Sequence, residues 1–105
     1  MEMEKTISLK FYGLPDSTVE RPIQRSIEVF GLTFHIHEWL KPNQSGGVER
    51  VDSKLRWRAS EESTGFGVPG SEAETIALCE LRLKKVIDRH GKTKTQEVVK
   101  SILRK

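Results

Sequence analysis

The clearest element in the chain is the stretch SEAETIALCELRLKKVIDRH, residues 71–90. Its apolar side chains recur every three or four residues, which is the spacing of the buried side of a helix. They are Ala73, Ile76, Cys79, Leu83, Val86 and Ile87. Ser71 and Glu74 have the spacing of a capping box, and Gly91 suits a C-terminal cap. The sequence therefore predicts a helix of about 19 residues over 72–90, capped by Ser71.

A second, shorter helix is predicted over residues 95–103. Its apolar residues have the spacing i, i+1, i+4, i+5, which places them on one face of a helix. They are Val98, Val99, Ile102 and Leu103. A helix this short needs packing to be stable, so this face must contact the sheet, the first helix or another chain. Homodimerisation through this helix, or through an edge strand, therefore stays open.

Upstream of both helices, apolar and polar side chains alternate, which is typical of strands with one buried face. Leu32, Phe34 and Ile36 share one face of such a strand, and His35 and His37 lie on the other. Five strands are predicted, over residues 5–12, 23–30, 32–39, 54–61 and 65–68. Strands followed by helices indicate an α+β fold, with an antiparallel sheet of four to five strands and both helices on one face.

Three segments between these strands have the composition of turns or loops. Gly31 either turns a hairpin or marks a bulge, and the hairpin is favoured because both flanking runs are long enough to pair. Residues 13–18, GLPDST, are predicted to form a turn. Residues 41–53 are polar and rich in glycine, and we expect them to form a flexible loop.

Length and composition set broader limits. The chain of 105 residues suits a single domain over residues 1–105, and it has no apolar run long enough to span a membrane. Its first residues lack the apolar region of a secretory signal. Cys79 is the only cysteine, so it excludes an internal disulfide and suits a reducing compartment. We therefore expect a cytoplasmic protein without a membrane partner, in which Cys79 is an inert packing residue.

The net charge of +3 conceals an asymmetry along the chain. Residues 1–80 carry 9 basic and 13 acidic side chains, whereas residues 81–105 carry 9 basic and 2 acidic ones. The basic end could bind nucleic acid, bind an acidic protein, or complement the acidic sheet of its own chain. A nucleic-acid-binding domain is therefore the alternative function. Its binding residues would be Lys84, Lys85, Arg89, Lys92, Lys94, Lys100, Arg104 and Lys105.

No motif in the sequence demands an enzyme. Residues 65–70, GFGVPG, match the letters of a dinucleotide-binding loop, but no strand follows the helix, and Glu72 and Glu74 would repel a pyrophosphate. His35 and His37 share a strand face, as metal ligands can, but further ligands at a matching spacing are lacking. We therefore predict no catalytic residues, no metal site and no cofactor.

Four short stretches resemble small proteins of phages and mobile genetic elements. They are IEVFGLTFHIH at residues 27–37, WRAS at 57–60, TG at 64–65 and EA at 72–73. The resemblance covers about residues 23–90 and consists of hairpins, a Trp strand that ends at a Thr-Gly turn, and a helix that begins with Glu-Ala. Many such proteins bind and block a host protein, as anti-CRISPR and other anti-defence inhibitors do. The resemblance implies a non-enzymatic inhibitor of a host protein, including one that handles nucleic acid.

The polar face of the sheet carries the residues that we expect to contact such a partner. Interface hot spots are rich in Trp and Arg. The candidates are therefore Trp39, Arg56 and Arg58, with His35 and His37 beside them. In the competing interpretation, Trp39 covers a sheet edge and the arginines pair with acids across strands.

Overall fold

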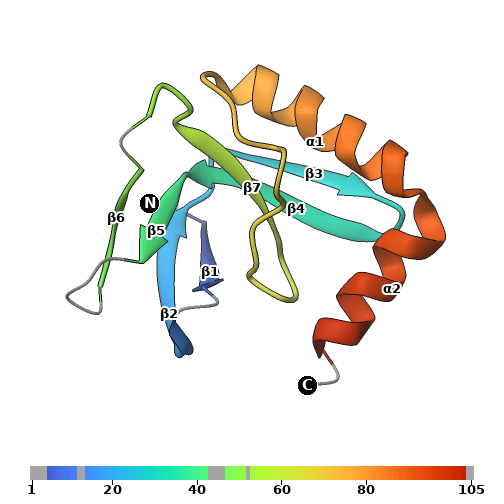
Figure 1. Ribbon diagram of the computed structural model, residues 1–105, viewed down its shortest axis with the longest axis horizontal. Coiled ribbons are helices and arrows are strands. Elements are labelled where there is room, and N and C mark those ends of the chain that lie inside the picture. Colours follow the sequence, from blue (N-terminus) through green and yellow to red (C-terminus); the bar gives the residue numbers. More distant parts are fainter. Residues whose placement is uncertain (1–4, 12–13, 43–46, 52, 104–105) are drawn as a thin grey trace.

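The computed structural model describes residues 5–11, 14–42, 47–51 and 53–103 (Figure 1). The described strands are β1 (Thr6–Phe11), β2 (Leu14–Pro22), β3 (Arg25–Val29), β4 (Leu32–Glu38), β5 (Leu40–Pro42), β6 (Val48–Arg50) and β7 (Trp57–Glu61). The described helices are α1 (Ile76–His90) and α2 (Lys92–Leu103). The predicted class is confirmed, because antiparallel sheets precede two helices in an α+β fold.

The strands form three small sheets, so the prediction of one sheet of four to five strands is wrong. The central sheet has the order β3-β4-β7, and β1-β2 and β5-β6 are separate two-stranded sheets. The strand expected over residues 65–68 is reduced to a single bridge between Ser60 and Gly67. This segment crosses β1 instead, where the Lys10 N–H donates to the Gly65 carbonyl at 2.9 Å. A Cβ at Gly65 would lie 2.5 Å from the Ser8 carbonyl oxygen, so the close crossing requires glycine.

The hairpin predicted at Gly31 is confirmed. β3 and β4 pair in regular antiparallel register up to Val29 and Leu32, so Phe30 and Gly31 form a two-residue loop. Both loop residues have positive φ, 55° and 76°. Such loops match the twist of the strands that they join. The turn thus fixes the register of the central sheet.

Helix α1 covers one face of the central sheet (Figure 1). The core between them is buried and apolar. The sheet contributes Ile27, Phe34, Ile36 and Ala59, and the helix contributes Cys79, Leu83 and Ile87. The helix residues are spaced three or four apart, as the sequence predicts for one buried stripe.

The helix begins later than predicted, at Ile76 instead of residue 72. Its N-cap is Thr75, whose hydroxyl accepts from the Leu78 N–H at 3.1 Å. Ser71 is not the cap: it is fully buried, accepts from the Ala59 N–H at 3.1 Å and donates to the Val68 carbonyl at 2.7 Å. The capping-box prediction failed because β7 uses the Ser71 hydroxyl. The Gly91 cap is confirmed, with φ of 79° and its N–H bonded to the Ile87 carbonyl.

Two strands lie where the sequence predicts a turn and a loop. β2 occupies much of the predicted turn at 13–18, and β6 lies inside the predicted loop at 41–53, of which residues 43–46 and 52 lie outside the described part. Neither strand alternates clearly between apolar and polar residues. Both belong to two-stranded sheets, in which backbone pairing needs no continuous apolar face. Between the two hairpins, Ile7, Leu9 and Leu40 form a second small core.

Helix α2 follows α1 directly and begins three residues earlier than the predicted residue 95. The Gln96 side chain donates to the Phe30 carbonyl at 2.9 Å, which ties α2 to the β3–β4 turn. Val99 is buried, but the adjacent Val98 is 51% exposed. Neither α1 nor α2, as described, is long and apolar enough to cross a membrane.

Candidate functional site

The five residues predicted to bind a partner do not form one exposed surface. His35 and His37 are only 8% and 3% exposed. They belong to β4, the central strand of its sheet, where every residue from Phe34 to His37 is buried. The strand face that the sequence predicts to be solvated is covered around His37, which lines a small cavity with residues of β1 and of the segment after β7.

Hydrogen bonds compensate the burial of both histidines. His35 lies 2.7 Å from the Ser26 hydroxyl through Nδ1, and 3.1 Å from the Glu62 carboxylate through Nε2. His37 Nδ1 donates to the Glu38 carbonyl at 2.6 Å, which leaves Nε2 to accept from the Ser60 hydroxyl at 2.6 Å. Burial lowers the pKa of His37 from 6.5 to about 4. His37 is therefore neutral at pH 7.

The Ser60–His37 pair has the contacts of a nucleophile and its base, with the base oriented by the Glu38 carbonyl. The burial of this pair argues against a catalytic role, because a substrate could not reach it. Ser60 is 1% exposed, and the adjacent cavity has a volume of only about 20 Å³. That volume accommodates about one water molecule. We therefore interpret the pair as a structural hydrogen bond between β4 and β7.

Arg58 is held by its own chain. Its Nε lies 2.8 Å from the Glu72 carboxylate, at ion-pair distance but without hydrogen-bond direction. Its guanidinium also lies over the Trp39 ring, 5.9 Å from the centroid. This contact covers part of Trp39. Arg56, in contrast, is exposed, and its guanidinium lies 5.8 Å from the centroid of the Trp57 ring. For Arg58, the competing interpretation of an arginine paired with an acid describes the structure.

The predicted nucleic-acid-binding cations are exposed wherever the structure describes them. They are Lys84, Lys85, Arg89, Lys92, Lys94 and Lys100, and Arg104 and Lys105 lie outside the described residues. Of this set, Lys84 pairs with Glu80. The ion pair between the sheet and α1 has the reverse polarity from that expected, because the sheet supplies Arg25 and the helix supplies Glu80. Among the described residues, no cation of α1 or α2 forms an ion pair with an acidic residue of the sheets.

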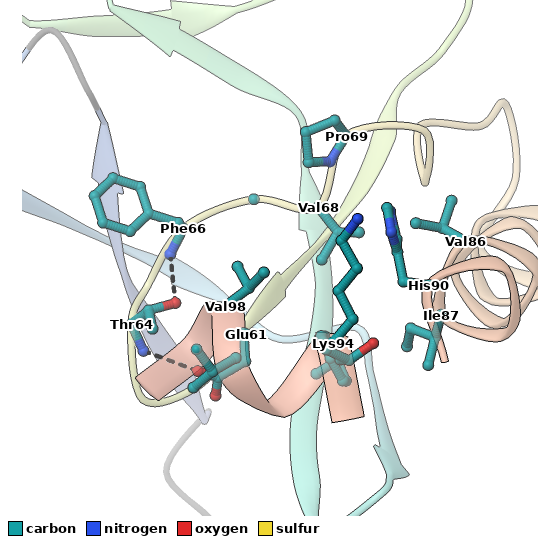
Figure 2. A pocket seen from close by; sticks show the side chains of 14 residues that line it. Glu61, Thr64, Phe66, Val68, Pro69, Val86, Ile87, His90, Lys94 and Val98 are labelled. Carbon is teal, nitrogen blue, oxygen red and sulfur yellow. Dashed lines mark hydrogen bonds between the residues drawn. The ribbon is translucent and has the colours of Figure 1, made fainter. Parts of the chain in front are cut away.

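Beside these cations lies an apolar pocket of about 270 Å³ that opens to the surface, here called the helix–loop groove (Figure 2). It lies between the end of α1, helix α2 and the segment from β7 to Pro69, with Phe34 of β4 also in its lining. The lining residues are Phe34, Glu61, Thr64, Phe66, Gly67, Val68, Pro69, Val86, Ile87, His90, Lys94, Thr95, Val98 and Val99.

The loop wall of the groove is fixed by hydrogen bonds around Glu61. Its buried carboxylate accepts from the Ser63 N–H at 2.6 Å, from the Thr64 N–H at 3.1 Å and from the Ser63 hydroxyl. The Thr64 hydroxyl in turn accepts from the Phe66 N–H at 3.2 Å. Figure 2 shows the bonds from Thr64 to Glu61 and from Phe66 to Thr64. The wall is therefore preformed, as is usual for binding sites.

The lining also carries Lys94, a cation, and His90. In Figure 2, the Lys94 side chain extends away from Glu61 and Thr64. Sequence reasoning missed this site, because its residues come from four separated segments. The only indication was the apolar face of the second helix, whose Val98 and Val99 needed a partner.

Other groups predicted to be inactive are placed as follows. Cys79 is buried, as expected, and burial raises the pKa of its thiol to about 12. The glycine-rich motif at 65–70 forms part of the loop wall and does not open a helix, because α1 begins only at Ile76. Among the described residues, no cluster of three or more His, Cys, Asp or Glu side chains could hold a metal ion.

Comparison of the chain with protein-family models, curated proteins and solved structures finds no match. The resemblance to small phage proteins therefore stays an expectation.

Proposed function

We propose that this chain is a non-enzymatic binding domain that docks onto another protein through the helix–loop groove. The observation that carries the proposal is an apolar opening whose edge includes Val98, a large side chain that is 51% exposed. Exposed apolar surface beside polar residues is typical of interaction sites. Leu81 is similarly exposed, at 50%, but does not line the groove, which makes it a matched control.

The polar groups that line the groove favour binding over catalysis. The Glu61 carboxylate is occupied by hydrogen bonds to the turn. The Thr95 hydroxyl donates to the Gly91 carbonyl at 2.7 Å, and the Thr64 hydroxyl accepts from the Phe66 N–H. His90 and Lys94 are the other polar residues of the lining. To act as a general base, either side chain would need a reacting group within hydrogen-bond distance. The groove thus offers contacts and charge, without a nucleophile beside a base.

The shape of the groove suits a protein partner. Its volume of about 270 Å³ is close to the lower end of the roughly 300–1,000 Å³ of small-molecule pockets, and it opens to the surface. Such a space suits one or two apolar side chains that project from a partner, as interface anchors do. An inhibitor of a host protein, which the resemblance of residues 23–90 implies, would act through this surface.

Nucleic-acid binding is the second candidate. It is favoured by the exposure of Lys85, Arg89, Lys92 and Lys100, for which the structure shows no ion pair among the described residues. Against it, the segment 76–103 contains no Phe, Tyr or Trp on which a base could stack. Binding to phosphates would weaken steeply as salt rises.

The test is affinity capture from a lysate of the native cells, with the wild-type chain, Val98→Glu and Leu81→Glu as baits. Both substitutions place a carboxylate at an exposed helix position, so both variants should remain folded. We expect one protein to bind wild type and Leu81→Glu in stoichiometric amount and to be lost from Val98→Glu, because a charge in an apolar contact costs binding energy. Circular dichroism of each bait provides the control for folding.

Two results would contradict the proposal. Equal capture by all three baits would place the docking surface elsewhere. Loss of the captured material after nuclease treatment would assign the chain to nucleic-acid binding.

A further inference from the structure

We infer that the segment that enters the helix–loop groove is an acidic peptide segment of the partner, which inserts a large apolar side chain and places a carboxylate beside Lys94. This inference rests on the proposed function and adds the chemistry of the partner to it. Its basis is the distribution of charge around the apolar lining.

Lys94 is an exposed cation that lines the pocket. No ion pair joins it to another described residue, and Glu97, three residues further along α2, is not within ion-pair distance. Glu61, the one acidic residue of the lining, already accepts three hydrogen bonds from its own turn. In Figure 2, the amino end of Lys94 points away from Glu61. A carboxylate on the ligand would supply the missing counter-charge.

The surroundings reinforce this polarity. Arg89 and Lys92, at the junction of α1 and α2, are exposed, and so is Lys100 further along α2. Asp88 and Glu97 are the only acidic residues in segment 81–105. Summed over several nearby cations, the potential attracts an anionic segment and repels a basic one. The His90 ring, which also lines the groove, adds a hydrogen-bond donor.

The apolar part of the ligand follows from the lining. Val86, Ile87, Val98 and Val99 line the groove from the helices, and Phe66, Val68 and Pro69 line it from the loop. A purely acidic segment would leave this apolar surface exposed to water, so the ligand must also carry an apolar side chain. A large apolar side chain next to an acidic residue satisfies both parts of the groove. A second copy of this chain fits less well, because a two-fold contact between grooves brings two cationic surfaces together.

A displayed library of random 12-residue peptides, selected on the full-length chain, tests the inference. The enriched peptides should carry Asp or Glu beside a Phe, Leu, Ile, Trp or Met residue. The best of them, measured by fluorescence anisotropy, should bind Val98→Glu and Lys94→Glu at least about tenfold more weakly than wild type. Leu81→Glu, the matched control, should bind as wild type does.

Charge reversal separates recognition from a loss of structure. When the acidic residue of the best peptide is replaced by Lys, the new peptide should bind Lys94→Glu better than it binds wild type. Enrichment of neutral or basic peptides, the absence of any enriched peptide, or unchanged binding to Lys94→Glu would overturn the inference. If these results came with protein capture that still depends on Val98, only the acidic chemistry would fall. If capture also ignored Val98, the proposed function would fall with it.

Discussion

Lowering the pH from 7 to 5 should reduce the free energy of unfolding by about 2 kcal/mol through His37 alone. In the folded protein, burial holds the pKa of His37 at about 4, whereas the unfolded chain titrates near 6.5. Between these values the unfolded state binds a proton that the folded state does not. Stability is therefore full above pH 6.5 and falls as the pH decreases toward 4.

The measurement is urea unfolding at several pH values, with His37→Gln as the control. Gln keeps a polar group near Ser60 but does not titrate, so the variant should be less stable at pH 7 and should lose much less stability on acidification. The other two histidines are present in both proteins, so the difference in slope isolates His37. Equal slopes for wild type and His37→Gln would show that the buried ring does not control the pH response.

Replacing Arg58 by Ala should destabilise the fold by about 2 kcal/mol, whereas Arg56→Ala should change stability by less than about 0.5 kcal/mol. Arg58 contacts both Glu72 and the Trp39 ring, so its removal leaves Glu72 without its cation. Breaking a fully buried pair costs roughly 3–5 kcal/mol. The effect expected here is smaller, because the two side chains are still 23% and 16% exposed.

Chemical unfolding of the two alanine variants, with Glu72→Gln and the double variant Arg58→Ala/Glu72→Gln, measures this coupling. The double variant should be less destabilised than the sum of the two single variants, because its two groups lie in direct contact. If Arg58→Ala is as stable as Arg56→Ala, Arg58 is free to contact a partner, as the sequence alone suggested.

Periodicity predicted the buried faces of α1 and of β4, and tertiary contacts decided the rest. The stripe of Cys79, Leu83 and Ile87 was predictable from spacing. The start of the helix was not, because Ser71 bonds the backbone of β7 and leaves capping to Thr75. The capping motif describes local chemistry, and it competes with any distant group that needs the same hydroxyl.

The two histidines illustrate the same limit. Alternation in β4 correctly put Phe34 and Ile36 on one face, but it does not show what covers the other face. Segments near Leu9 and Gly65 do so around His37, and no local pattern predicts such long-range packing. The groove could not be predicted either, because its walls come from distant segments that meet only in the folded chain. What the sequence did indicate was an apolar face on α2 without an obvious cover, and Val98 lies on it.

The central claim is that a partner docks in the helix–loop groove and not on the sheet face around Trp39. The most direct measurement is the change in backbone ¹⁵N–¹H chemical shifts of the full-length chain on addition of the captured protein or the best selected peptide. We expect the largest changes on residues 64–69 and 86–99, with little change at Trp39, Arg56 and Arg58. Changes centred on those three residues, with the groove unaffected, would contradict it.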